Sequence, residues 1–186
     1  RFIMNCAISS MGYDLPAAVG ACVAAEKKPI ICIAGDGSIM MNLQELQTIV
    51  TNELPVKIFI INNQGYQQIR ITQSNLFDKN YVGIGPDSRD LGFPDFGKIA
   101  EAFGIPYRKC EELTMLTEMV DWMLNEKQYS MLEICCTTEQ IFEPKSATKR
   151  SADGSLYSPP LEDLAPFLSR EELKKNMFIP MWEEGN

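Results

Sequence analysis

The sequence contains no histidine. Within these 186 residues, this absence excludes imidazole metal sites, Ser-His-Asp triads and Cys-His dyads. Any acid–base chemistry must therefore come from carboxylates, from a bound cofactor, or from another chain or domain.

Basic charge and long apolar runs are also scarce. The chain has 17 Lys and Arg residues against 25 Asp and Glu residues, a net charge of −8. This balance argues against nucleic acid and anionic membranes as partners, because both bind basic surfaces. No apolar run approaches the roughly 18 residues of a membrane-spanning helix, and polar residues interrupt the N-terminal segment before a signal peptide can form. We expect a cytoplasmic protein, and the start at Arg1 suggests a piece of a longer one.

The six cysteines form no Cys-x-x-Cys pair. Cys22 and Cys32 lie in apolar runs, and Cys135 and Cys136 end another. This distribution favours free thiols in a reducing cytoplasm over a disulfide framework.

Two apolar runs, residues 29–34 and 55–61, are nearly continuous and rich in β-branched residues. Such runs are typical of buried strands in a parallel sheet. Between them, residues 42–50 carry apolar side chains at helical spacing. The three segments predict a strand–helix–strand unit with a right-handed crossover. Both strands then end at the same edge of one sheet, where open α/β sheets bind ligands.

Oxygen ligands follow both strands. Asp36 comes after the first in a Gly-Asp-Gly-Ser motif, and Asn63 comes after the second. Carboxylate and amide oxygens suit Mg²⁺ or Ca²⁺, and Mg²⁺ completes its shell with water and phosphate oxygens. Gly37 and Ser38 precede a helix predicted to begin near Met40, whose free N–H groups attract phosphate. The pattern indicates a Mg²⁺-bridged diphosphate; the alternative is a tight turn and a helix cap without a ligand.

The remaining sequence continues the alternation of helices and strands. Residues 78–94 are a long loop with several Gly and Pro residues, and such loops often carry binding functions. The fold class is α/β: a doubly wound, mainly parallel sheet with helices on both faces. Further helices are predicted at 14–26, 96–103 and 114–126, a site-forming turn and short helix at 64–74, and further strands at 106–108 and 130–136.

The C-terminal part has a different composition. Prolines interrupt residues 141–186 repeatedly, and a capping box at Ser169 opens a short helix. Apolar residues recur too often for simple disorder. We expect residues 1–140 to form the α/β domain and residues 141–186 to form an extended C-terminal arm, packed on that domain or on a neighbouring subunit. A partly mobile C-terminus is the alternative.

Four segments together carry a family resemblance: Ser-Met-Gly-Tyr-Asp-Leu-Pro-Ala-Ala-Val-Gly-Ala at 10–21, Gly-Asp-Gly-Ser at 35–38, Asn-Leu-Gln-Glu-Leu at 42–46 and Asn-Asn at 62–63. The set resembles the C-terminal diphosphate-binding domain of thiamine-diphosphate-dependent enzymes of the acetolactate synthase group. The resemblance covers roughly residues 1 to 140. It implies the thiamine-diphosphate-binding fold, with thiamine diphosphate and Mg²⁺ as cofactors.

The resemblance also implies roles for individual residues. Asp36 and Asn63 would bind Mg²⁺ through side-chain oxygens, and Gly65 would bind it through its backbone carbonyl. Met11 would wedge the cofactor into a bent shape, and Gly37 and Ser38 would contact the diphosphate. The full cofactor-binding set implied in this way is Met11, Gly35, Gly37, Ser38, Asn63, Gly65 and Tyr66.

No catalytic residue is identified in the chain. Acetolactate synthases tend to place Met and Trp on the substrate side where this sequence has Gln68 and Thr72. These two side chains are candidates for hydrogen bonds to a hydroxylated acceptor, or they face solvent or the C-terminal tail. Arg70 either binds a substrate carboxylate or is an ordinary surface charge.

For the whole protein, the resemblance implies decarboxylation of a 2-oxo acid and transfer of the product to a second carbonyl compound. A glutamate from a missing domain, on a partner subunit, would contact the cofactor. The expected partners are therefore the missing N-terminal domains and further copies in a homodimer or tetramer, and the isolated chain is expected to be inactive. The alternatives are a 2-oxo acid decarboxylase of the same cofactor class and a non-catalytic α/β module for nucleotide binding or assembly. A Gly-x-Gly-x-x-Gly fingerprint would favour that module, and none follows either strand.

Overall fold

The computed structural model describes residues 1–5, 8–151 and 153–181. The chain divides into two compact units, Arg1–Thr138 and Glu139–Asn186. Among the described residues, none of the helices has both the length and the apolar character needed to cross a membrane.

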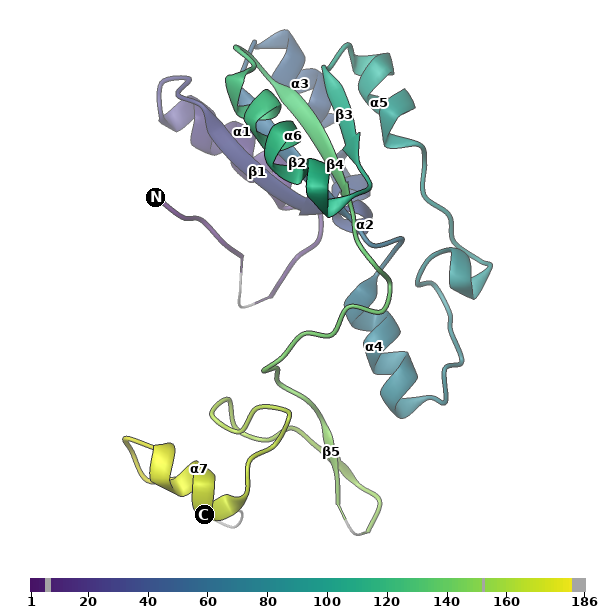
Figure 1. The fold of residues 1–186 in the computed structure, drawn as a ribbon, viewed down its shortest axis with the longest axis vertical. Coiled ribbons are helices and arrows are strands. Elements are labelled where there is room, and N and C mark those ends of the chain that lie inside the picture. The colour runs from purple at the N-terminus through teal and green to yellow at the C-terminus, as the bar shows by residue number, and fades with distance from the viewer. Residues whose placement is uncertain (6–7, 152, 182–186) are drawn as a thin grey trace. The chain divides into compact units, whose positions relative to one another are not determined.

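The first unit contains a four-stranded, wholly parallel sheet in the order β1-β2-β4-β3 (Figure 1). Its strands are β1 (Ile30–Gly35), β2 (Val56–Asn62), β3 (Tyr107–Cys110) and β4 (Ser130–Cys135). Its α-helices are α1 (Asp14–Ala24), α2 (Asp36–Ile39), α3 (Glu45–Thr51), α4 (Gln67–Leu76), α5 (Phe96–Phe103) and α6 (Leu116–Asn125). Short 3₁₀ helices are η1 (Met40–Asn42), η2 (Pro86–Ser88) and η3 (Leu113–Met115).

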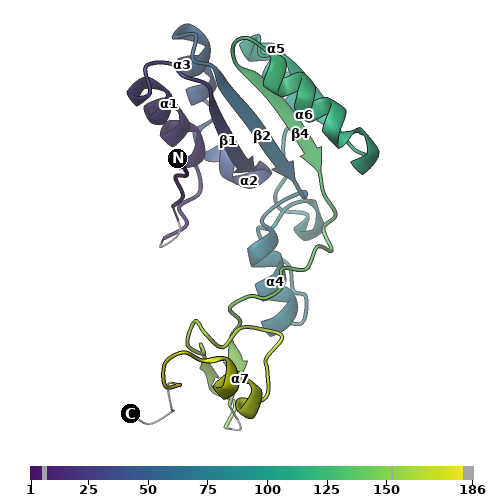
Figure 2. The ribbon, with the colours of Figure 1, turned by 60° about the vertical axis from the view of Figure 1, so that its left-hand side comes forward.

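Helices cover both faces of this sheet (Figure 2). On one face, α1, α3 and α5 bury Leu15, Leu46 and Phe96 against β1 and β2. On the other face, α6 packs Met123 against Phe59 of β2 and the neighbouring strand β4. This layering confirms the predicted doubly wound α/β fold.

The strand–helix–strand prediction is also confirmed. β1 and β2 pair in parallel, from Ile30 opposite Val56 to Gly35 opposite Ile61. The residues that follow the two strands therefore leave the sheet at the same edge. The connection between the strands differs from the single helix predicted for residues 42–50, because α2, η1 and α3 follow one another.

The first helical turn begins at Asp36, not near Met40 as predicted. Asp36 Oδ1 accepts a hydrogen bond from the Gly37 N–H at 2.8 Å. This local bond supports a turn immediately after the strand, a backbone alternative that aspartate offers readily.

Strand β1 is less buried than the sequence predicted. Cys32 and Ala34 are buried beneath the helices, but Ile31 and Ile33 are 57% and 64% exposed. β1 is an edge strand, and α6 packs over β2, β3 and β4 on that face. The apolar run predicted the strand correctly, whereas its burial depends on which helix lies over it.

Helix α5 begins and ends where the sequence predicted. Asp95 Oδ1 accepts a hydrogen bond from the Lys98 N–H at 3.2 Å, and Gly104 ends the helix with a φ of +68°. Before α5, residues 78–94 form the predicted long loop, which contains η2.

The second unit contains the antiparallel strands β5 (Lys149–Arg150) and β6 (Leu156–Tyr157) and the helix α7 (Arg170–Asn176). Ser169 Oγ accepts a hydrogen bond from the Glu172 N–H at 3.2 Å, which confirms the predicted helix cap. The residues predicted as a C-terminal arm, 141–186, fall within this second unit. Packing of this unit on another domain or subunit stays a prediction.

A buried aspartate organises the second unit. Asp163 is 3% exposed and accepts hydrogen bonds from Lys149 Nζ at 2.9 Å and from Arg170 Nη2 at 2.7 Å. Burial opposes ionisation of Asp163, but these two cations outweigh it and hold the pKa of the carboxyl below its ordinary value.

The thiols support the sequence prediction. Cys22, Cys32, Cys110, Cys135 and Cys136 are all free, and Cys6 lies outside the described residues. Burial raises the pKa of the Cys32 thiol to about 12, so this group stays protonated at neutral pH.

Candidate functional site

Asp36 stands at the carboxyl end of β1 and is 1% exposed. Its Oδ1 accepts a hydrogen bond from the Gly37 N–H, and its Oδ2 accepts one from the Gly65 N–H, both at 2.8 Å. The second bond joins the end of β1 directly to the turn that follows β2. The structure therefore brings Asp36 together with two of the residues predicted beside it.

Asp36 is a buried anion that has no ion-pair partner among the described residues. Burial raises the pKa of its carboxyl above the ordinary value, against the opposing effects of the Gly65 and Gly37 N–H groups and of the Arg70 charge. A carboxylate offers about four lone-pair positions. Asp36 thus retains acceptor capacity, and a bound cation would offset the cost of burying its charge.

The turn after β2 has a demanding backbone. Gln64 and Gly65 have φ values of +59° and +134°. A Cβ atom on Gly65 would collide with the Ile84 carbonyl oxygen, so only glycine fits. The neighbouring Tyr66 N–H donates to that same oxygen at 2.9 Å. The turn is therefore packed tightly against the long loop that precedes α5.

The two adjacent asparagines have different environments. Asn62 Nδ2 donates to Glu133 Oε1 at 2.6 Å, and Asn62 Oδ1 accepts from the Gln64 N–H at 2.9 Å. Tyr107 in turn donates its hydroxyl to Glu133 Oε2 at 2.5 Å. Asn62 is therefore committed to the turn, whereas the partly exposed Asn63 side chain makes no hydrogen bond within the described part of the chain.

A second turn approaches α2 from the N-terminal segment. Ser38 Oγ donates to Asp14 Oδ2 at 2.5 Å and accepts from the Gly12 N–H at 3.0 Å. Asn42 Nδ2 donates to the Gly12 carbonyl at 2.6 Å. These bonds fix the turn that carries Met11, whose side chain is 46% exposed. Sequence reasoning did not identify Asp14 and Asn42 as supports for this turn.

Tyr66 and the glycines of the motif complete the sheet edge. A Cβ atom on Gly37 would collide with the Tyr66 ring, and the Tyr66 hydroxyl donates to the Gly37 carbonyl at 3.4 Å. Beside Gly35, by contrast, no described residue other than its chain neighbours has an atom within 4 Å of the position that a Cβ would take. The edge thus combines a close aromatic contact with open space.

Helix α4 presents its two predicted substrate-side residues to solvent. Gln68 and Thr72 are exposed, and the Thr72 hydroxyl donates to the Gln68 carbonyl at 3.0 Å. Their hydrogen bonds do not link them to Asp36. Arg70, on the same helix, is only 5% exposed, so the interpretation as a surface charge is wrong. The sequence did contain a signal for this burial: Gln67 and Arg70 are three residues apart, which places both on one face of the helix, and both are buried.

The donor chemistry limits what the edge can hold. Within the described ranges, no three His, Cys, Asp or Glu side chains gather closely enough to bind a metal ion. A cation here would depend on one carboxylate, Asp36, together with amide and carbonyl oxygens. Hard divalent cations accept such a set when phosphate or water oxygens complete it.

Comparison with known proteins identifies a family and several relatives that this chain resembles. Residues 1–134 match the family described as thiamine pyrophosphate enzyme, C-terminal TPP binding domain, where TPP denotes thiamine diphosphate. The acetolactate synthase large subunit of Pyropia yezoensis is 45% identical over 105 residues, which are 56% of this chain and 17% of that protein.

Two further relatives are matched over longer stretches. The acetolactate synthase isozyme 2 large subunit of Escherichia coli (strain K12) is 37% identical over 134 residues, 72% of this chain and 24% of the relative. The chloroplastic acetolactate synthase of Arabidopsis thaliana is 32% identical over 143 residues, 75% of this chain and 21% of the relative. The matches thus span about a fifth of the length of these proteins.

Proposed function

Because the chain belongs to the C-terminal TPP-binding domains of thiamine pyrophosphate enzymes, we propose that it binds thiamine diphosphate together with Mg²⁺ at the carboxyl ends of β1 and β2. The observation that carries the proposal is the 2.8 Å hydrogen bond from the Gly65 N–H to Asp36 Oδ2. This bond draws two strand ends together around a buried carboxylate.

Three oxygen donors would hold the cation: the Asp36 carboxylate, the Asn63 amide oxygen and the Gly65 carbonyl. Asp36 has acceptor capacity left, and the side chain of Asn63 makes no hydrogen bond in the described part of the chain. Mg²⁺ binds oxygen ligands of this kind and takes the rest of its shell from water and phosphate. Gly37 and Ser38 would contact the diphosphate.

Three further residues would complete the cofactor site. Met11 has an exposed side chain on a turn fixed by hydrogen bonds and would contact the cofactor. Gly35 leaves open space at the edge, and Tyr66 lies beside the motif. When bound, thiamine diphosphate supplies the carbanion chemistry of 2-oxo acid decarboxylation, and the protein supplies binding, orientation and electrostatics.

A thermal titration tests the binding. Thiamine diphosphate and Mg²⁺ should raise the Tm of the chain when added together, and either one alone should have a much smaller effect, because ligands that bind the folded state stabilise it by mass action. Asp121→Asn, at an exposed position of α6, is a matched control that should keep the full response. An unchanged Tm at millimolar concentrations of both ligands contradicts the proposal.

For the whole protein, we propose an acetolactate synthase-like enzyme that decarboxylates a 2-oxo acid and transfers the product to a second carbonyl compound. The names of the relatives support this activity, and their greater length supports the need for further domains and for a homodimer or tetramer. The free thiols fit the cytoplasmic location that the sequence favours. The isolated chain should not turn over pyruvate, and measurable turnover would contradict this part of the proposal.

The choice of acceptor is tied to two polar side chains, since Gln68 and Thr72 are both exposed on α4. We propose that they favour a hydroxylated acceptor. Product analysis of the full-length enzyme separates transfer from simple decarboxylation, and competition between acceptors tests the preference. If 2-oxobutyrate outcompetes every polar acceptor, the role of Gln68 and Thr72 is refuted.

A further inference from the structure

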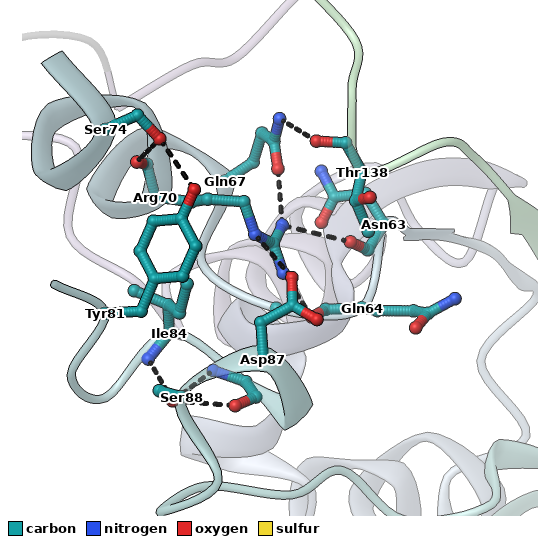
Figure 3. A network of polar contacts seen from close by, with 12 residues as sticks. Asn63, Gln64, Gln67, Arg70, Ser74, Tyr81, Ile84, Asp87, Ser88 and Thr138 are labelled. Atoms are coloured by element: carbon teal, nitrogen blue, oxygen red, sulfur yellow. Dashed lines mark hydrogen bonds and ion pairs between the residues drawn. The ribbon is translucent and has the colours of Figure 1, made fainter. Parts of the chain in front are cut away.

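The guanidinium of Arg70 is buried against the turn that follows β2 (Figure 3). Its Nη2 donates to the Gln64 carbonyl at 3.0 Å, and its Nη1 donates to the Asn63 carbonyl at 3.4 Å. Nη1 also donates to Gln67 Oε1 at 2.5 Å. Nε lies 3.4 Å from Asp87 Oδ2 and makes no hydrogen bond within the described residues. One buried cation therefore contacts two consecutive carbonyl groups of the turn.

This use of the guanidinium is specific. A buried charge is costly unless hydrogen bonds satisfy it. The carboxylate of Asp87 is 51% exposed, and it approaches only the Nε side of Arg70. The other side of the planar group points its N–H donors at backbone carbonyls, a geometry that arginine provides and lysine does not.

The turn needs external support because its conformation is unfavourable by itself. Gln64 adopts the left-handed conformation, which a residue with a Cβ avoids, and Gly65 has a φ of +134°. Asn62 Oδ1 holds the Gln64 N–H, and Arg70 holds the Gln64 carbonyl. Both polar groups of the strained residue are thus fixed, directly before the N–H that contacts Asp36.

Helix α4 holds Arg70 in place through its own neighbours. Gln67 Nε2 donates to the Thr138 carbonyl at 2.8 Å, which fixes the side chain that receives Arg70 Nη1. Ser74 Oγ donates to the Arg70 carbonyl at 2.8 Å and lies 2.9 Å from the Tyr81 hydroxyl. Figure 3 shows the guanidinium at the centre of this network.

We propose that Arg70 is a positioning residue for the cofactor site: it fixes the carbonyls of Asn63 and Gln64 and thereby holds the Asn63 side chain and the Gly65 carbonyl in place beside Asp36. The inference rests on the proposed function, because that function supplies the ligand of the site. The hydrogen bonds of Arg70 to the turn are present without that ligand. It replaces the substrate-binding role that the sequence suggested for Arg70.

Two simpler roles for Arg70 predict different results. If Arg70 acts only through its positive charge near Asp36, then Arg70→Lys should behave like the parent chain. If Arg70 acts only by docking the loop through Asp87, then Asp87→Asn should be as damaging as any change of Arg70. Arg70→Gln removes both charge and geometry. Lys98→Gln removes an exposed positive charge from α5 and serves as the control.

Amide hydrogen exchange at Gly65 is the first measurement, because its N–H is bonded to Asp36 and reports the turn without cofactor. Arg70→Gln and Arg70→Lys should each speed this exchange at least about tenfold, since one hydrogen bond to a charged group is worth about that factor. Asp87→Asn and Lys98→Gln should change it less than about threefold. Ile58, a buried residue of β2, is the control for an intact fold: its amide should exchange at the same rate in every variant as in the parent chain.

Mg²⁺-dependent binding of thiamine diphosphate, measured by calorimetry, is the second measurement. Both Arg70 variants should weaken binding at least about tenfold. The positioning role is overturned if Arg70→Lys keeps the Gly65 exchange rate and the cofactor affinity of the parent chain. It is also overturned if Asp87→Asn impairs both quantities as strongly as the Arg70 variants do. If Arg70→Gln does not fold, Arg70→Lys decides alone. If the parent chain binds no cofactor, the proposed function fails, while exchange at Gly65 still decides the role of Arg70.

Discussion

The substitution Asp36→Asn isolates the contribution of the buried carboxylate. Asparagine has nearly the same shape, but it replaces one carboxylate oxygen with an NH₂ group. One of the two N–H groups now bonded to Asp36, from Gly37 or Gly65, then loses its acceptor. A buried donor without an acceptor costs about 1–3 kcal/mol.

The lost charge acts in the opposite direction. The pKa of Asp36 is raised mainly by burial, even with the N–H bonds and the Arg70 charge included, so ionisation of Asp36 costs more in the folded state than in the unfolded chain. At neutral pH, removal of the charge therefore stabilises the ligand-free fold. Because the two effects oppose each other, we expect the free energy of unfolding without ligand to change by less than about 2 kcal/mol.

The ligand-dependent part of the stability should respond quite differently. At a hundredfold excess of ligand over its Kd, binding adds about 2.7 kcal/mol. For a chain of this size, that increment raises the Tm by about 5–10 °C. Asp36→Asn removes the anionic cation ligand, so the increase should fall below about 2 °C.

Scanning calorimetry of the parent chain, Asp36→Asn and the control Asp121→Asn, each with and without Mg²⁺ and thiamine diphosphate, measures all of these quantities. The reasoning is refuted if Asp36→Asn keeps half or more of the parental increase in Tm. A loss of the ligand-free fold would also refute it, because the opposing effects would then not balance.

Further predictions concern pH, the turn and the second unit. Because the folded pKa of Asp36 is raised, its contribution to ligand-free stability should fall as pH rises from the ordinary aspartate pKa through the folded value. Measured from pH 4 upward, the Tm of the parent chain should therefore decrease relative to the Tm of Asp36→Asn. Gly65→Ala should cost at least about 2 kcal/mol in denaturant unfolding and abolish the ligand response. Gly92→Ala should cost less than about 1 kcal/mol, because no described residue other than its chain neighbours has an atom within 4 Å of the added Cβ. Arg170→Met should destabilise the second unit by about 1–3 kcal/mol, measured as faster proteolysis of that unit. Because the pKa of Asp163 is lowered, the stability from the Arg170–Asp163 pair is present above the unfolded pKa of Asp163 and should be lost as pH falls through its folded pKa.

Local features of the fold were accessible from the sequence. Asp95 and Gly104 mark the ends of α5, and both act through bonds or backbone angles within a few residues. The apolar runs of β1 and β2 and the helical spacing between them required a parallel pair, so Asp36 and Asn63 had to leave at one edge. Motif and topology together were enough to locate the candidate site.

Side-chain burial and the different roles of adjacent residues could be seen only in the tertiary structure. Ile31 and Ile33 have the same apolar character as the buried residues of β2, yet they are exposed because α6 does not reach over the edge strand. Asn62 and Asn63 are the same residue type, and only the structure shows that Asn62 is the one bonded to Glu133 and to the Gln64 N–H.

Arg70 is the clearest case of such a role. The composition of α4 suggests a solvated charge, but the strained peptide groups of the preceding turn lie within reach of its guanidinium. Residue type and spacing determined that Asp36 and Asn63 follow the ends of two neighbouring parallel strands. Which donors are free to bind a ligand, and which are consumed in holding the backbone, depends on contacts between segments distant in the chain, and those exist only once the fold has formed.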